Sequence, residues 1–192
     1  MEILERASLR RGSFLFGVTR LLKVRRKNKR FNIFSGKAAL SDQVGDLPNC
    51  EECIKILSFG GFSSASLIAF VAEKTRIRRL LVSTFRVGKK EIQMLNALHS
   101  AGRLEKAEFV VFSLMQESDD HGYFQLLQAV CSKNGWSVKT LKNHSKVILL
   151  DTDDGFFVCE TSSNLNENPK IEQFSIEQDE ALFEFYRQNL FI

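Results

Sequence analysis

Short segments in which hydrophobic and polar residues alternate recur through the first two-thirds of the chain, separated by segments with helical spacing. The alternation predicts strands over 31–34, 53–57, 79–85 and 108–114. Apolar positions three and four apart predict helices from Ser63 or Ser64 to about Lys74, from Gly88 to Gly102, and around Phe124, ending near Gly135. Strands that alternate with helices along a chain form a parallel sheet with helical crossovers on its faces.

The last third of the chain has a different rhythm. Strand-like segments at 138–141, 144–150, 156–161 and 171–176 follow one another with short connections, and Asp153-Asp154-Gly155 is typical of a hairpin turn. A helix is predicted over 179–190, where Leu182, Phe183 and Tyr186 form an apolar side. The predicted fold class is therefore α/β, with a mixed, largely parallel β-sheet sandwiched between helices.

Length and charge define one domain with a basic extension. The 192 residues, with 44% hydrophobic and 26% charged residues, are ordinary for one globular domain. The net charge of +4 is uneven: residues 1–36 carry ten Lys and Arg against two Glu, a net of +8, which leaves −4 on the rest. We therefore divide the chain into a basic amino-terminal arm, residues 1–30, and a single domain, residues 31–192.

Nothing in the sequence predicts a membrane span, because no apolar run approaches the roughly 20 residues that one requires. The apolar stretch at 14–18 is interrupted too soon, at Arg20 and Lys23, to be a signal peptide. The four scattered cysteines do not form a disulfide framework, and Cys50 and Cys53 lack the second pair that a structural zinc site needs. We predict a cytoplasmic protein.

Candidate chemistry is concentrated in the last third. His144 and Lys146 are two residues apart, so on a strand both side chains project from one face. A neutral imidazole is a nucleophile and an ammonium supplies positive charge, which together suit attack on a phosphate. Ser162 and Asn164 repeat this spacing and offer hydroxyl and amide donors, although both residue types are also common in turns. Glu172, at the next strand, is a candidate partner for the Nδ1 proton of His144.

These residues resemble the phospholipase D superfamily, whose pattern is His-x-Lys-x4-Asp, a hairpin, Gly-Ser-x-Asn and a downstream Glu. The segment from His144 to Asp151 (HSKVILLD) matches the first block in full. The segment from Thr161 to Asn164 (TSSN) matches the second, except that Thr161 stands where Gly is usual. Residues 168–173 (NPKIEQ) are similar to the continuation in small, single-motif members from bacteria and phages.

The resemblance implies a phospholipase D-like α-β-α sandwich and a two-step mechanism through a phosphohistidine. Each active site then needs two motifs, yet neither His99 nor His121 has a lysine two positions later, so the chain holds one. The implied assembly is a homodimer that shares one groove, with no metal and no other cofactor. Asp151 is implied to have a structural role.

The substrate is suggested by the basic residues. Six of the eight residues at 23–30 are positively charged, which favours nucleic acid, DNA above all, over a lipid. Arg86 follows a strand where phosphate-binding loops often lie. The predicted substrate-binding residues are Arg86, Lys23, Arg25, Arg26, Lys27, Lys29 and Arg30. Alternatives remain open: a surface Arg86, a basic tail without a specific partner, an inactive nucleic-acid-binding protein signalled by Thr161, or a lipid phosphodiesterase.

Overall fold

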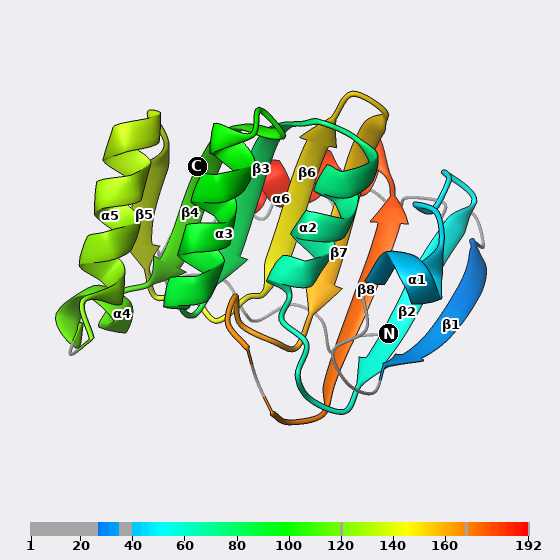
Figure 1. Cartoon of the computed structure of the whole chain (residues 1–192), viewed down its shortest axis with the longest axis horizontal. Helices are drawn as coiled ribbons and strands as arrows, with labels where there is room; N and C mark the ends of the chain where they lie inside the picture. The colour runs from blue at the N-terminus through cyan, green and yellow to red at the C-terminus, as the bar shows by residue number, and fades with distance from the viewer. Residues whose placement is uncertain (1–26, 35–39, 120, 168, 192) are drawn as a thin grey trace, which may run out of the picture.

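A single mixed sheet of eight strands organises the protein, in the order β1-β2-β8-β7-β6-β3-β4-β5 (Figure 1). The computed structural model describes residues 27–34, 40–119, 121–167 and 169–191. The strands are β1 Asn28–Phe34, β2 Glu52–Ser58, β3 Ile77–Thr84, β4 Leu104–Phe112, β5 Ser137–Leu141, β6 Val147–Thr152, β7 Gly155–Thr161 and β8 Glu172–Gln178. The sheet is mixed, as predicted. Three of its strand pairs are parallel (β1·β2, β3·β4, β4·β5), and the four pairs that involve β6, β7 and β8 are antiparallel.

Helices cover both faces of the sheet, which confirms the predicted α/β sandwich. Figure 1 shows α1, α2, α3 and α5 in front of the sheet and α6 behind it. The helices are α1 Leu40–Val44, α2 Ala65–Lys74, α3 Lys89–Ser100, α4 Leu114–Glu117, α5 Tyr123–Asn134 and α6 Glu180–Leu190. In the described ranges, no helix combines the length and the apolar character needed to cross a membrane.

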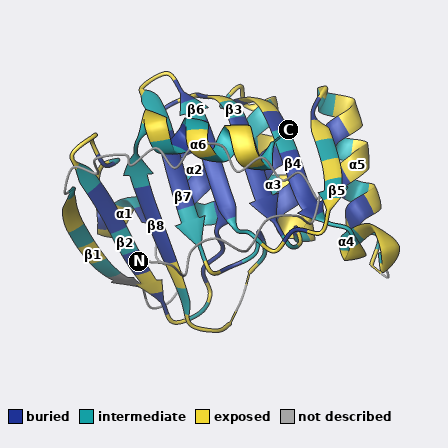
Figure 2. Ribbon diagram, turned by 180° about the vertical axis from the view of Figure 1, so that it is seen from behind, coloured by how far each residue is buried: buried dark blue, intermediate teal, exposed yellow. Residues whose placement is uncertain are grey.

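The central strands are buried because helices pack on both of their faces. Leu80 and Val82 of β3 belong to the larger hydrophobic core under α2 and α3, whereas Leu81 belongs to a smaller core under α6, with Phe183 at its centre. A strand that is covered on both faces reads as a continuous apolar run rather than an alternation. Figure 2 shows this contrast between the buried centre of the sheet and its more exposed outer strands β1 and β5.

The local signals in the sequence fix most element ends. Gly102 and Gly135 follow α3 and α5 with φ angles of 69° and 67°, the left-handed conformation that commonly ends a helix. The Asp153-Asp154 turn joins β6 to β7, and the Thr152 hydroxyl stabilises it by accepting a bond from the Asp154 amide. The strands β1 and β4 begin earlier than predicted, and the short helices α1 and α4 were not predicted.

The two thiols of the Cys-x-x-Cys pair differ in exposure. Cys50 is exposed and Cys53 is buried, and both are free. Burial raises the pKa of the Cys53 thiol above its ordinary value. Reactive cysteines have the opposite property, a lowered pKa at an accessible position.

Candidate active site at one edge of the sheet

One edge of the sheet gathers the candidate residues from four strand ends. Because β6 and β8 run antiparallel to β3, β7 and β2, their amino-terminal ends meet the carboxy-terminal ends of those neighbours. This is the lower edge in Figure 1. The structure brings together at this edge His144 and Lys146 before β6, Ser162 and Asn164 after β7, Glu172 at the start of β8, and Arg86 after β3.

The backbone of the His-x-Lys segment differs from the prediction. The prediction placed 144–150 on a strand, but β6 begins at Val147, so His144, Ser145 and Lys146 form the connection that leads into it. The physical reason is local competition for hydrogen bonds. The Asn143 Oδ1 accepts bonds from both the amide (2.9 Å) and the hydroxyl (2.7 Å) of Ser145, which turns the chain before the sheet ladder begins.

Asn143 positions the candidate site, and this role was not predicted from the sequence. Its side chain is buried, and its Nδ2 donates to the Ser83 hydroxyl at 2.9 Å and to the Val110 carbonyl at 3.0 Å. It also reaches the Thr84 carbonyl at 3.4 Å. Asn143 therefore ties the ends of β3 and β4 to the segment that carries His144. Its partners are about sixty and thirty residues earlier in the chain, so no local pattern signals this role.

His144 and Lys146 contact each other directly. The Lys146 Nζ lies 3.3 Å from the His144 Nδ1 and donates to the His144 carbonyl at 3.0 Å. An ammonium group can only donate, so Nδ1 is the acceptor in this contact. The imidazole is exposed and packs against the Phe85 ring, with the ring centroids 5.3 Å apart.

The charge on Lys146 depends on its surroundings. Burial lowers the pKa of the Lys146 ammonium below its ordinary value, and the negative charge of Glu172 opposes that shift. The two groups are thus electrostatically coupled across the edge of the sheet. A partly desolvated cation next to a nucleophile is an arrangement suited to binding an anion.

Ser162 and Glu172 are paired. The Ser162 hydroxyl donates to the Glu172 carboxylate and accepts a bond from the Gln173 amide at 3.0 Å. The predicted partner of Glu172 was instead the Nδ1 proton of His144, and in this structure Nδ1 faces Lys146. The role of Glu172 toward His144 stays a prediction.

Asn164 is positioned through its backbone. Its carbonyl accepts bonds from the Ser64 hydroxyl at 2.9 Å and the Ser163 hydroxyl at 3.0 Å. Its side-chain Oδ1 is buried and has no hydrogen-bond partner among the described residues. Ser64 therefore does not cap α2 with its side chain, as one prediction had it; the Ser63 hydroxyl accepts the Ala65 amide instead, at 3.2 Å.

Thr161, where the family pattern has Gly, occupies an ordinary strand position. It pairs with Phe174 in the ladder between β7 and β8, and its amide donates to the Lys146 carbonyl at 3.2 Å. Its hydroxyl accepts a bond from the Ser163 amide at 2.8 Å. The backbone here does not need the conformational freedom of glycine, and the hydroxyl closes the first turn of the loop that carries Asn164.

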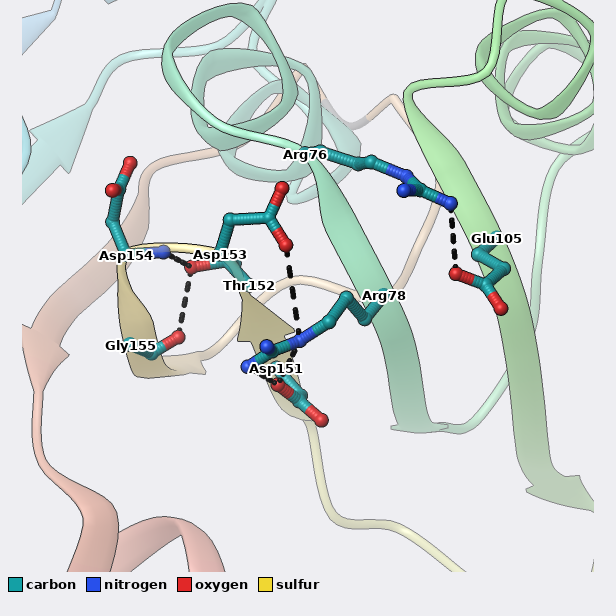
Figure 3. Close-up of polar contacts among 8 residues, drawn as sticks. All are labelled: Arg76, Arg78, Glu105, Asp151, Thr152, Asp153, Asp154 and Gly155. Atoms are coloured by element: carbon teal, nitrogen blue, oxygen red, sulfur yellow. Dashed lines mark hydrogen bonds and ion pairs between the residues drawn. The ribbon is translucent and has the colours of Figure 1, made fainter.

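Arg86 and Asp151 have separate environments. Arg86 is exposed, its guanidinium carbon lies 5.2 Å from the centroid of the Phe85 ring, and it forms no ion pair with a described residue. Asp151 lies near the other end of β6 and pairs with Arg78, with its Oδ1 2.6 Å from Nη2 (Figure 3). This ion pair joins β6 to β3 at the edge opposite the candidate site, which fits the structural role predicted for Asp151.

The six cationic residues at 23–30 fall into two groups. Three of them lie outside the described residues: Lys23, Arg25 and Arg26. The other three lie at the beginning of β1: Lys27, Lys29 and Arg30. Lys27 is held by Glu177 and Asp179, each at 2.9 Å, and Arg30 is 3.6 Å from Glu52. The structure thus places Lys27 at the sheet edge opposite His144 and uses it, with Arg30, to attach β1.

Similar solved structures share this fold. No protein-family model matches the chain, and no curated protein matches it. The crystal structure of polyphosphate kinase from Porphyromonas gingivalis superposes with a TM-score of 0.51 and 12% identity, over 71% of this chain and 25% of that chain. Phosphatidylserine synthase from Haemophilus influenzae Rd KW20 gives a TM-score of 0.50 and 17% identity, over 71% of this chain and 38% of that one. At these identities the similarity shows a shared fold.

Removal of the Asn143 side chain is expected to destabilise the protein. Asn143→Ala leaves the Ser83 hydroxyl and two strand-end carbonyls without their buried donor, which should lower the free energy of unfolding by about 3 kcal/mol. Urea denaturation measures this change. Ser145→Ala is the matched control, with an expected loss of about 1 kcal/mol. Equal losses in the two variants would contradict the role of Asn143.

The Thr161 hydroxyl is expected to protect the Ser163 amide from hydrogen exchange. Thr161→Val keeps the side-chain shape but removes the acceptor, so exchange at Ser163 should become about tenfold faster. Thr161→Ser should retain slow exchange. The Gln173 amide, which bonds to Ser162, serves as the internal reference. If hydrogen exchange at the Ser163 amide is as slow in Thr161→Val as in the unmodified protein, the turn does not depend on the Thr161 hydroxyl.

Proposed function

We propose that the protein is a phosphodiesterase of the phospholipase D superfamily that cleaves DNA. The observation that carries this proposal is the convergence of His144, Lys146 and Asn164 at one edge of the sheet, in the order and spacing of the superfamily motif. Ser162 and Glu172 lie at the same edge. The fold shared with a polyphosphate kinase and a phosphatidylserine synthase supports an enzyme that acts on phosphate groups.

The first chemical step is attack by His144 on phosphorus. Its Nε2 forms a bond to phosphorus while the bond from phosphorus to the leaving oxygen breaks, and that oxygen takes a proton from His144 of the partner subunit, which starts as the imidazolium and becomes neutral. In the second step water attacks the phosphohistidine, the partner's His144 takes a proton from the water, and the bond from nitrogen to phosphorus breaks. The products are an alcohol and a phosphate monoester, and both histidines return to their starting states.

Lys146 controls when His144 becomes a nucleophile. Without substrate, Lys146 contacts Nδ1 and the ring proton is on Nε2, which is not the nucleophilic form. A bound phosphate attracts the ammonium, and Nδ1 is then free to hold the proton and donate to the Glu172 carboxylate. This transfer leaves the Nε2 lone pair available. The charge on the phosphate is stabilised by two Lys146 side chains and by Asn164 and Ser162, so the scheme includes no metal and no other cofactor.

The scheme requires a homodimer, because one chain contributes one motif. A two-fold axis through the groove brings the same residues of both subunits onto a single phosphate. DNA is favoured as substrate by the positive charge of residues 1–36, of which six cationic residues lie at 23–30. The cations of the arm that precede Lys27 are proposed to contact the phosphate backbone beyond the site.

Metal-independent cleavage of DNA tests this proposal. Plasmid DNA incubated with the protein in EDTA should be nicked, and His144→Ala should abolish the nicking because the nucleophile and the acid are both lost. Asp151→Asn is the matched control, since Asp151 lies at the other edge of the sheet and should leave cleavage intact. Binding of DNA without cleavage by the unmodified protein would favour the inactive nucleic-acid-binding alternative. Cleavage of phosphatidylcholine but not DNA would favour a lipid phosphodiesterase.

Mixing the unmodified protein with His144→Ala tests, in the same assay, whether two subunits share one site. If one groove needs a histidine from each subunit, activity after subunit exchange should fall with the square of the unmodified fraction as His144→Ala is added. A linear fall would mean that each chain acts alone. A protein that sediments strictly as a monomer would contradict the scheme.

The pH dependence of cleavage is expected to report the ionisation of Lys146. Because burial lowers the pKa of Lys146, kcat/KM should decline on the alkaline side at a lower pH than an ordinary lysine would give. Glu172→Gln removes the charge that opposes this shift, so the decline should move to still lower pH. Lys146→Arg keeps its charge at all these pH values, so the decline should disappear from the residual activity. An unchanged alkaline limb in Lys146→Arg would show that another group titrates.

A further inference from the structure

A cavity opens beside the candidate site. Its volume is about 470 Å³, within the usual range for small-molecule pockets. Three segments form its walls: the loop after β3, the connection from β4 to α5, and the loop that follows Asn164. The side chains that matter here are Phe85, Arg86, Leu114, His121, Tyr123 and Asn166.

Two contacts link the lining of the cavity to the candidate site. Phe85 lines it and also packs edge-on against His144, and a stacked Phe112 ring 4.7 Å away holds Phe85 in place. Asn166 lines it as well, and its amide donates to the Asn164 carbonyl at 2.8 Å. A group in the cavity therefore lies next to the phosphate that His144 would attack.

The lining combines aromatic and charged groups. Leu114 and Tyr123 are 45% and 36% exposed, although large apolar side chains are usually buried. Arg86 has no ion pair with a described residue, and His121 contacts the Tyr123 ring with centroids 5.4 Å apart. The Asp119 carboxylate adds an acceptor, which is held in place by the Phe124 and Gln125 amides, each at 3.0 Å.

These properties point to a flat ring with a polar edge as the occupant. A base stacks on aromatic side chains whatever its identity, and its edge offers donors and acceptors to charged neighbours. An acyl chain would place Arg86, Asp119 and His121 against hydrocarbon, which is unfavourable for all three. The cavity also adjoins the phosphate position, as the base of a flanking nucleotide must.

We propose that this cavity binds the base of a nucleotide adjacent to the reacting phosphate, with Tyr123 as a stacking surface. The inference deepens the proposed function, because the base belongs to the substrate of the same groove. It adds a binding role for residues that the His-x-Lys motif does not include. It also makes the enzyme prefer phosphodiesters that carry a base over those that do not.

Affinity for a base tests this site separately from catalysis. The probe is a hexadeoxynucleotide with one 2-aminopurine, whose fluorescence is quenched on stacking, and the comparison is an oligonucleotide that is abasic at the same position. The unmodified protein should bind the first about tenfold more tightly than the second. Tyr123→Ala should reduce this ratio toward one, and Tyr123→Phe should keep it, since the ring and not the hydroxyl stacks. Phe185→Ala, at an exposed ring on α6, is the control and should keep the ratio as well.

Three results separate this inference from the proposed function. A ratio near one in the unmodified protein, or an equal fall in Tyr123→Ala and Phe185→Ala, would overturn the base site. Tighter binding to phosphatidylcholine vesicles than to the oligonucleotide, lost in Tyr123→Ala, would overturn it in favour of a lipid. Hydrolysis of methyl p-nitrophenyl phosphate, which carries no base, reports the chemistry alone. If that hydrolysis is absent while the tenfold ratio is present, the base site stands and the phosphodiesterase proposal fails.

Discussion

The reversed direction of β6 and β8, which lie in the middle of the sheet and run opposite to its other strands, is the constraint on which the rest of the structure depends. If all the strands ran parallel, the segments before β6 and β8 would lie at the opposite edge from the segments after β2, β3 and β7. The reversal brings these ends to one edge, where His144 precedes β6, Asn164 follows β7 and Glu172 begins β8. The hydrophobic cores on both faces fix the register of those strands and hence the positions of their ends.

At the edge that carries the site, polar side chains supply hydrogen-bond partners for backbone groups of the loops and strand ends. Loops there lie against buried strand ends, where unpaired backbone groups are costly. Asn143 donates to the Val110 carbonyl of a strand end. Ser64 donates to the Asn164 carbonyl, and Thr161 accepts from the Ser163 amide, in the loop that carries Asn164. The site residues themselves are left exposed or half-buried, and the Oδ1 of Asn164 has no hydrogen-bond partner in the part of the chain that the structure describes. The scaffold thus holds the loops firmly while the groups that would meet a substrate remain available.

Positive charge is likewise divided between residues that hold the fold together and residues at the candidate site. The cationic residues that open β1 are used within the fold, since Lys27 and Arg30 pair with carboxylates of β8, β2 and the residue that caps α6. At the site edge the positive charge of the candidate set comes from Lys146 and Arg86, and Lys146 is partly offset by Glu172. The candidate residues of one chain thus contribute two cations to this edge.

The sequence by itself determined the elements and the chemical candidates. Hydrophobic periodicity is a local property, so the main strands, the longer helices, the hairpin turn at Asp153-Asp154 and the α/β class could be predicted, with errors mainly at element ends. The His-x-Lys spacing likewise identified His144 and Lys146. The tertiary structure decided which groups position them. Asn143 bonds Ser83 across sixty positions and Ser64 bonds Asn164 across a hundred. Such contacts depend on the order and direction of strands, which no local pattern encodes, and for the same reason the cavity lined by Phe85 and Tyr123 could not be predicted.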